Sequence, residues 1–235
     1  VDRLDSGSLL TSQTPEASVA DAIAISRAVS GLDSVVGFSM APRFAPSCSR
    51  ELLKMVAHAS ADTGIPVHTH CSENDEENEL SLQRFGLRPM ALFEKFGLLG
   101  PNTRLAHCVK VTDDEIAMLA RTETKVLHCP TTNMKLGSGI APVPAMLAAG
   151  VHVSLGADGA PANNNLDMFR EMRAASLIQK ALHGPEAMPA GLLVAMATIN
   201  GARAMGLDAI TGSIEPGKRA DLLVLDPRMP HSTGF

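Results

Sequence analysis

Histidines and carboxylates stand at the ends of short apolar runs in the middle of this chain. The first run, residues 67–74, contains His68 and His70 and reaches Glu73 shortly after His70. Because the side chains of a strand alternate between its two faces, His68 and His70 are expected to point to the same side. A histidine on an apolar strand is more often a core residue than a ligand, so this run alone does not predict a metal site.

The same pattern recurs downstream, and the recurrence is what points to chemistry. Further apolar runs end at His107, at His128 and, in the segment 151–159, at Asp158. Imidazole and carboxylate groups are donors that a divalent ion takes in proteins, and a bound ion lowers the pKa of its water to about 7. The carboxyl ends of parallel strands meet at one rim, where these side chains are expected to converge. The sequence therefore predicts a metal-dependent hydrolase built on a (β/α) barrel.

Helical periodicity and turn signals separate these runs. Near-helical spacing predicts a helix over 15–30, Ser49 is expected to cap a helix over 50–62, and Thr112 opens another with a capping-box pattern. Further helices are expected at 74–85, 89–96, 143–149, 166–182 and 189–205, and loops at 130–139 and 160–165. Strand and helix alternate, which predicts an α/β fold with a parallel sheet.

Both ends of the chain add to this pattern. An apolar strand is expected at 35–40, and it runs into a proline-bounded loop that holds Arg43. Beyond the last helix, the turn-rich segment 212–218 leads to a β-run at 220–226, which lies outside the strand–helix alternation. We expect a second, smaller domain to begin there.

Composition narrows the class of protein. The chain has 235 residues, of which 45% are apolar and 19% charged, a length that suits one α/β barrel or a piece of one. A formal net charge of −5 without a basic run argues against a nucleic-acid partner. No apolar run approaches the roughly 18 to 20 residues of a membrane span, so no membrane partner and a cytoplasmic location are expected.

The cysteines are expected to be buried side chains without a chemical role. Three of the four, Cys71, Cys108 and Cys129, directly follow a histidine of the rim. Because neighbouring residues of a strand face opposite sides, such a His–Cys pair cannot converge on one ion. A disulfide framework is not expected in a domain of this size without a secretory signal.

Several segments carry a resemblance to a known family. They are 70–73, 105–108, 128–144, 156–160 with 163–168, 197–203 and 215–222. The chain resembles the amidohydrolase superfamily, in the branch of ring deaminases that includes methylthioadenosine/S-adenosylhomocysteine deaminase and guanine deaminase. The last of these segments is similar to the family's return to its small β domain. The resemblance covers nearly the whole chain from about residue 35 onward.

The resemblance implies roles for individual residues. His70 and Asp158 correspond to ligands of one divalent ion, zinc in the first place and iron as the alternative. Glu73 corresponds to the proton shuttle, and His107 faces the metal-bound water and the substrate, so Glu73, His107 and Asp158 are the expected catalytic residues. Arg43, Glu73 and His107 are the expected substrate-binding residues.

Two residues keep alternative interpretations. Arg43 is similar to an arginine of guanine deaminases whose planar donor fork reads a ring carbonyl, and a surface or supporting salt bridge is its alternative. The segments 134–143 and 160–168 are more similar to the methylthioadenosine/S-adenosylhomocysteine type, so the exact ring stays open. For His128, a structural role and a substrate contact are both open.

The implied activity is hydrolytic deamination. A metal-bound hydroxide would attack the amine-bearing carbon of an amino-substituted purine or related N-heterocycle, a small-molecule substrate, and ammonia would leave. A related chlorohydrolase or amidohydrolase of a triazine or pterin-like ring is one alternative. A non-catalytic barrel scaffold that has lost its metal is the other, and homo-oligomer formation is left open.

One departure from the family pattern changes what is expected of this chain. The family's first barrel strand carries a His-x-His pair that supplies two ligands, whereas residues 1–44 contain no histidine. We therefore expect a partial TIM (β/α)8 barrel, about its last five βα units, over residues 1–206, with the N-terminal strands missing. Residues 207–235 would begin a small β-sandwich domain. As it stands, the chain is expected to be an inactive fragment with an exposed sheet edge.

Overall fold

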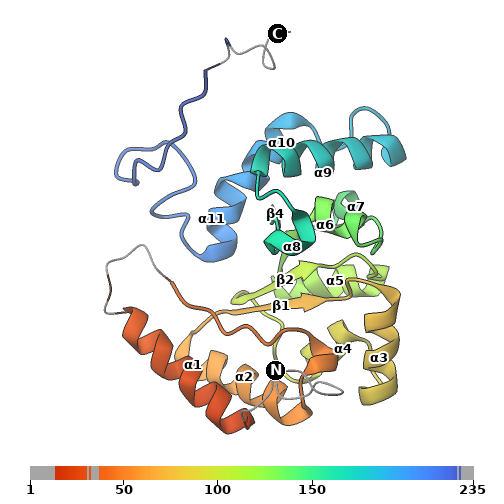
Figure 1. Ribbon diagram of the computed structural model, residues 1–235, viewed down its shortest axis with the longest axis vertical. Helices are drawn as coiled ribbons and strands as arrows, with labels where there is room; N and C mark the ends of the chain where they lie inside the picture. The colour runs from red at the N-terminus through yellow and green to blue at the C-terminus, as the bar shows by residue number, and fades with distance from the viewer. Residues whose placement is uncertain (1–13, 31, 33–36, 227, 229–235) are drawn as a thin grey trace.

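Four parallel strands form the centre of the structure. The computed structural model describes residues 14–30, 32, 37–226 and 228. The strands are β1 (Val67–Cys71), β2 (Thr103–His107), β3 (Lys125–His128) and β4 (Val153–Leu155), and their order in the sheet is β1-β2-β3-β4. Strands that neighbour each other in the sequence are thus neighbours in space, as in a barrel wall (Figure 1). The predicted parallel α/β class is confirmed.

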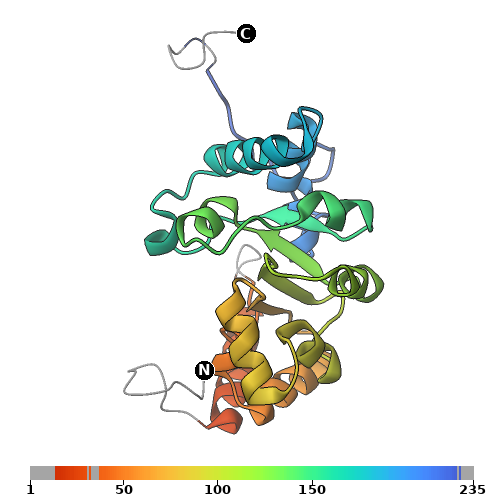
Figure 2. The same cartoon turned by 90° about the vertical axis from the view of Figure 1, so that its right-hand side faces the viewer.

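Helices join the strands and stand at both ends of the sheet. Helices α1 (Pro15–Ser30) and α2 (Arg50–Thr63) pack together beyond β1, and α9 (Met168–His183), α10 (Ala190–Ala197) and α11 (Ile199–Met205) gather at the opposite end (Figures 1 and 2). The remaining elements are η1 (Ala45–Ser47), α3 (Asp75–Phe85), α4 (Pro89–Lys95), α5 (Asp113–Thr122), α6 (Pro130–Lys135), α7 (Val143–Ala148) and α8 (Ala160–Asn163).

Local sequence signals explain where the predicted helices begin and end. Ser49 caps α2 by accepting a hydrogen bond from the Leu52 N–H, and Gly64 ends that helix in the left-handed conformation, with φ of 71°. Thr112 and Glu115 form the predicted capping box at the start of α5. Because such caps satisfy backbone groups that the helix leaves free, they locate its ends within one or two residues.

Two predicted loops are wrong. The segment 130–139 contains α6, and 160–165 contains the short helix α8. Both begin with proline in the first turn, where its missing N–H costs nothing. Glu171 of α9 supports both, since its carboxylate accepts hydrogen bonds from the Thr131 N–H at 3.2 Å and from Asn163 Nδ2 at 2.9 Å. Tertiary contact, which sequence propensity cannot report, stabilises these turns.

The ends of the chain also differ from the prediction. The helix expected over 189–205 is broken at Thr198, whose φ of −125° and ψ of −96° lie outside the helical region. Residues 220–226 form no strand, and Val224 is 97% exposed. The strand predicted at 35–40 lies partly outside the described residues, and of its described part only Met40 pairs, in a single parallel bridge with Val67. The predicted domain boundary at 206 stays a prediction.

The core lies between the sheet and its helices. Its largest fully buried apolar side chains are Leu53, Met90, Leu92, Phe93, Leu105, Leu119, Met146 and Met196. All four cysteines are free and buried, as expected of small apolar side chains. Among the helices that the structure describes, none combines the length and the hydropathy that crossing a bilayer requires.

The capping box of α5 is open to a direct test. Substitution of Thr112→Ala removes the acceptor of the Glu115 N–H, so the free energy of unfolding should fall by about 1 kcal/mol. Thr112→Ser keeps the oxygen and should stay within about 0.5 kcal/mol of the parent. Urea titration of the three proteins measures both values. Equal stability of Thr112→Ala and the parent would contradict the assigned cap.

Candidate active site

The end of β1 presents His70 with one ring nitrogen already engaged. Burial alternates along this strand, with Val67, Thr69 and Cys71 buried, so the predicted alternation of faces is confirmed. His70 Nδ1 lies 2.7 Å from the carbonyl oxygen of Arg43. A carbonyl only accepts, so the proton resides on Nδ1 and the lone pair of Nε2 is free to bind a metal. Burial lowers the pKa of His70, with a smaller contribution from His107, which keeps the ring neutral.

The end of β2 brings His107 against His70. The two rings are stacked, with centroids 5.2 Å apart and an angle of 27° between their planes. His107 is only 1% exposed, and its Nδ1 lies 2.8 Å from Asn133 Oδ1. Its Nε2 has no hydrogen-bond partner among the described residues and lies 3.8 Å from Glu73 Oε2. This nitrogen is therefore open to a metal, a water or a substrate.

The two carboxylates approach from different loops. Glu73 follows β1, and its Oε1 accepts a hydrogen bond from Ser138 Oγ at 3.2 Å. Asp158 lies beyond β4, is half-buried, and accepts a hydrogen bond from the Gly159 N–H through Oδ1 at 2.6 Å. One oxygen of each carboxylate is thus held while the other is available for proton transfer or for metal binding.

Three of these side chains form a cluster suited to a cation. The potential ligand atoms of His70, His107 and Asp158 all lie within 4.8 Å of one another. Two neutral imidazoles and a carboxylate are donors that zinc and related ions accept, and the Nδ1 contact of His70 is the usual orienting bond of a metal-binding histidine. The residues present therefore fit a divalent ion. The separate roles predicted for His107 and for the two ligands stay predictions.

The backbone at this rim is unusual. Ser72, His107, Cys108 and Asp158 have φ between 48° and 72°, in the left-handed region that residues with a Cβ rarely adopt. Each such residue costs of order 1–3 kcal/mol and persists only where the surroundings hold it. Concentration of these conformations at the strand ends that bear the cluster is typical of a functional site.

Two contributors were missed from the sequence. Asn133 binds the ring of His107, and Ser138 binds Glu73, so the segment 130–139 contacts both groups. Both side chains are buried, with exposures of 1% for Asn133 and 5% for Ser138. The resemblance included this segment, but its many turn formers offered no reason to select these two positions.

His128 does not join the cluster. It is 1% exposed and lies among residues of α6, the following loop and α9, including Asn133 and Ile178. Neither ring nitrogen has a hydrogen-bond partner among the described residues. Burial, and to a smaller extent His107, lowers the pKa of His128 to about 4. The expected convergence of four strand ends is thus met by His70, His107 and Asp158 alone.

Arg43 supports the site through its main chain. Its carbonyl oxygen accepts from His70 Nδ1 and from the His70 N–H, whereas its side chain is exposed, with the guanidinium carbon 5.8 Å from the centre of the Phe44 ring. The side chain contributes no described contact to the cluster. Its predicted substrate contact stays a prediction.

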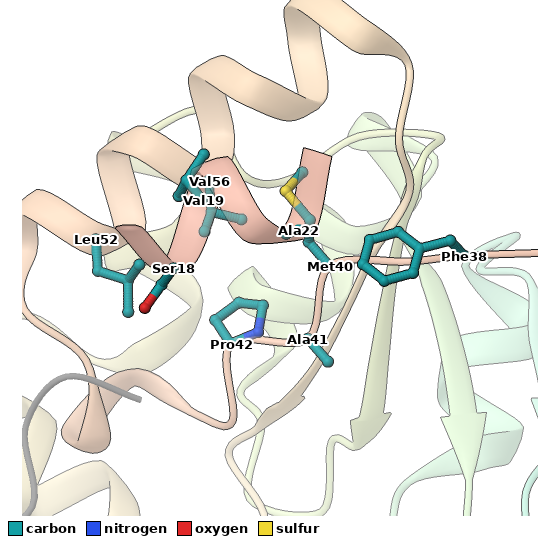
Figure 3. Close-up of a pocket in the computed structure, with 9 residues that line it drawn as sticks. All are labelled: Ser18, Val19, Ala22, Phe38, Met40, Ala41, Pro42, Leu52 and Val56. Atoms are coloured by element: carbon teal, nitrogen blue, oxygen red, sulfur yellow. The ribbon is translucent and has the colours of Figure 1, made fainter. Parts of the chain in front are cut away.

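A separate cavity lies on the other side of β1. It measures about 210 Å³ and is lined by residues of α1 and α2 and by residues 38–42 (Figure 3). Val19, Val56 and Met40 line it, and among the described residues Ser18 is the only polar side chain of the lining. Because no acid, base or metal ligand lines it, this cavity is not a candidate for the chemistry of the strand ends.

Comparison with known proteins agrees with the geometry. A parallel α/β sheet that gathers imidazoles and carboxylates at its strand ends is the arrangement that metal-assisted barrel hydrolases use. The chain belongs to the amidohydrolase family, whose model matches residues 6–233. The family-level resemblance seen in the sequence is confirmed.

Individual relatives are similar over about half of their length. A 5-methylthioadenosine/S-adenosylhomocysteine deaminase of Moorella thermoacetica is 47% identical over 193 residues, which is 82% of this chain and 45% of that protein. The structure of an adenosine deaminase from Xanthomonas campestris with bound zinc has a TM-score of 0.87 at 32% identity, covering 91% of this chain and 49% of that one. The structure of guanine deaminase from C. acetobutylicum, with bound guanine, has a TM-score of 0.80 at 29% identity. The match covers 88% of this chain and 50% of that one.

The buried ring of His128 predicts a pH-dependent stability. Its pKa of about 4 in the folded chain lies below the value of about 6.5 expected when unfolded, so only the unfolded chain takes up this proton between those values. The contribution of the neutral His128 ring to the free energy of unfolding is full above pH 6.5 and is lost as the pH falls toward 4. Over this range the parent should lose about 3 kcal/mol more than His128→Gln, because each unit of pKa is worth about 1.4 kcal/mol.

Urea titrations between pH 4 and 7 measure that difference. His183→Gln, at an exposed position of α9, serves as the control and should follow the parent. If the free energy of unfolding of the parent and of His128→Gln changed equally with pH, the assignment of a buried, neutral His128 ring would be wrong.

Proposed function

We propose that this chain supplies one part of the active site of a metal-dependent aminohydrolase, which releases ammonia from an amino-substituted purine or related N-heterocycle. The observation that carries the proposal is the convergence of His70, His107 and Asp158, with Glu73 3.8 Å from His107. The chain spans about half the length of the relatives it matches. The active unit is therefore proposed to be the full-length protein, meaning this chain with any coding sequence that flanks it.

An adenosine-type substrate is favoured over guanine. The deaminase relative named for methylthioadenosine and S-adenosylhomocysteine is 47% identical to this chain, whereas the guanine deaminase structure is 29% identical. The side chain of Arg43, the feature that pointed to guanine, makes no described contact with the cluster. A cytoplasmic location and the identity of the metal stay predictions, with zinc favoured by the zinc-bound neighbour.

His70 and Asp158 would hold the metal, His70 through the lone pair of Nε2. A divalent ion at this position would lower the pKa of a water to about 7 and so provide hydroxide at neutral pH. The free oxygen of Asp158 is able to accept the proton that this water loses.

Glu73 and His107 would act on the substrate. Glu73, held by Ser138, would protonate a ring nitrogen, which makes the amine-bearing carbon electrophilic. Asn133 Oδ1 accepts from His107 Nδ1 and fixes the ring so that Nε2 faces the cluster. In the doubly protonated ring, Nε2 would donate to the oxygen that becomes negative. As the carbon–nitrogen bond breaks, the amine would take the proton that Asp158 accepted and leave as ammonia, and the proton of the added hydroxyl group would pass to Glu73, which restores the acid.

Metal content and ammonia release test the proposal together. The full-length protein should hold about one divalent ion and release ammonia from adenosine-type nucleosides faster than from guanine or aminotriazines. His70→Ala and Asp158→Asn should lower the metal content at least 10-fold, while the exposed control His183→Ala leaves it unchanged. Elemental analysis and an ammonia assay on the same samples provide the readouts.

Each alternative has its own outcome in this experiment. Chloride release from a chlorotriazine without deamination would favour the hypothesis that the full-length protein is a chlorohydrolase. The other outcome is that the full-length protein binds no metal and turns over none of these compounds. That result would refute the proposed enzyme and support the hypothesis of a non-catalytic scaffold.

Glu73 is the residue whose removal should separate chemistry from metal binding. Glu73→Gln removes the proton donor but leaves His70 and Asp158 intact, so kcat should fall about 10²- to 10⁴-fold at unchanged metal content. The control Glu76→Gln changes an exposed carboxylate in the first turn of α3, three residues after Glu73, and should keep full activity. Activity of Glu73→Gln within a few-fold of the parent would exclude the proton-transfer role.

A further inference from the structure

A buried carboxylate next to the cluster has no part in the proposed chemistry. Glu77, in the first turn of α3, is 4% exposed. Its Oε1 accepts a hydrogen bond from the Ser72 N–H at 3.0 Å, and its Oε2 accepts one from the Glu73 N–H at 2.7 Å. No basic side chain of the described residues forms an ion pair with it. Because burying an uncompensated carboxylate is unfavourable, this position needs a specific reason.

The bonds of Glu77 do not serve the helix end on which it lies. Asn74 is the N-cap of α3 and already accepts from the Glu77 N–H at 2.8 Å. Elsewhere in this chain Glu115, at the same place in α5, reaches back to the N–H of its own N-cap, Thr112. Glu77 instead passes over Asn74 and holds the two preceding residues. The carboxylate therefore fixes the loop that leads into α3.

That loop determines where Glu73 points. Ser72 has φ of 50°, a conformation that must be held by its surroundings in a residue with a Cβ. Glu77 binds the N–H groups of this turn, while the Ser72 carbonyl accepts from the N–H groups of Val109 and Lys110 at 3.0 and 2.9 Å. The backbone of Glu73 is thereby fixed on both sides.

The same first turns of α3 also reach the loop after β2. Asn78 Nδ2 donates to the Lys110 carbonyl at 3.1 Å, and Lys110 lies shortly after His107. Glu77 and Asn78 thus join the loop of Glu73 to the loop of His107. Glu73 Oε2 and His107 Nε2, which lie 3.8 Å apart, thus belong to the two loops that this junction connects.

We propose that Glu77 is the positioning residue of Glu73: its carboxylate clamps the Ser72–Glu73 turn, so that the acid is directed at the reacting ring. The inference rests on the proposed function, because it assumes that Glu73 transfers the proton. Glu77 itself touches neither substrate nor metal. Burial raises the pKa of Glu77 to about 7 although the two backbone bonds lower it, which agrees with a carboxyl enclosed in a dry site.

Glu77→Gln in the full-length protein tests the proposal. The carboxamide keeps one acceptor oxygen but turns an N–H₂ group toward the second backbone N–H, so one of the two bonds is lost. We expect kcat to fall about 10- to 100-fold with KM and metal content within about 2-fold of the parent. Glu79→Gln, at an exposed position of α3, is the matched control and should leave both constants unchanged.

A double variant separates positioning from general damage. If Glu77 acts through Glu73, adding Glu77→Gln to Glu73→Gln should lower kcat less than 2-fold further, because the acid it positions is already absent. Independent losses that multiply, or a Glu77→Gln enzyme with parental kcat, would overturn the proposal. Loss of metal from Glu77→Gln would show a structural role instead.

Amide hydrogen exchange gives a second readout that does not depend on activity. In this chain the Ser72 and Glu73 amides should exchange at least 10-fold faster in Glu77→Ala than in the parent, while amides of β3 stay unchanged. Equal exchange would refute the clamp itself. Should the full-length protein release no ammonia, faster exchange would preserve the clamp while the proposed function fails, so the two ideas fail separately.

Discussion

The parallel register of the sheet is the constraint on which the candidate site depends. His70 pairs with Ala106, and Cys71 pairs with His107, so the ends of β1 and β2 lie level with each other. Two imidazoles that are far apart in the sequence thereby stack at 5.2 Å. The register thus brings the two strand ends level, although it pairs His107 with Cys71 and not with His70.

Register alone does not complete the arrangement. Ala106 is the partner of His70, so a strand continued regularly past Ala106 would direct the next side chain to the opposite face. The left-handed φ of 72° at His107 ends the strand and accompanies a ring that lies against His70 instead. His128, whose partner is Leu155, has no such turn and stays buried among the helices. Backbone conformation therefore decides which histidine joins the cluster.

What could be predicted from the sequence follows from the range of the interactions involved. Alternation in β1 and the caps of α2 and α5 depend on neighbours within a few residues, so these elements were predicted closely. Helix α6, helix α8 and the selection of Asn133 depend on partners such as Glu171 that are distant in the sequence. Periodicity contains no information about such partners, and the resemblance identified their segment without their contacts.

The buried polar residues around the cluster act together to hold Glu73 and His107 in place. Asn133 and Ser138 bind the side chains of His107 and Glu73, whereas Glu77 and Asn78 bind the backbone on which Glu73 and His107 are carried. Hydrogen bonds of this kind add little net stability, but they fix geometry, because each would be costly to leave unmade once buried.

Donors for the metal and strand neighbours on the outer edge of β1 are both few among the described residues. His70, His107 and Asp158 provide three donors. On the edge of β1 away from β2, the described residues contribute the bridge of Met40 and the hydrogen bond from the His70 N–H to the Arg43 carbonyl. A tetrahedral catalytic site takes three protein ligands, and His107 acts on the substrate in the proposed mechanism, so the proposal requires one ligand besides His70 and Asp158. A barrel removes open edges by adding strands, and added strand ends also supply ligands to the rim. Metal affinity and closure of the sheet should therefore rise together when flanking sequence is present, whereas the positions of Glu73 and His107 are already set within this chain.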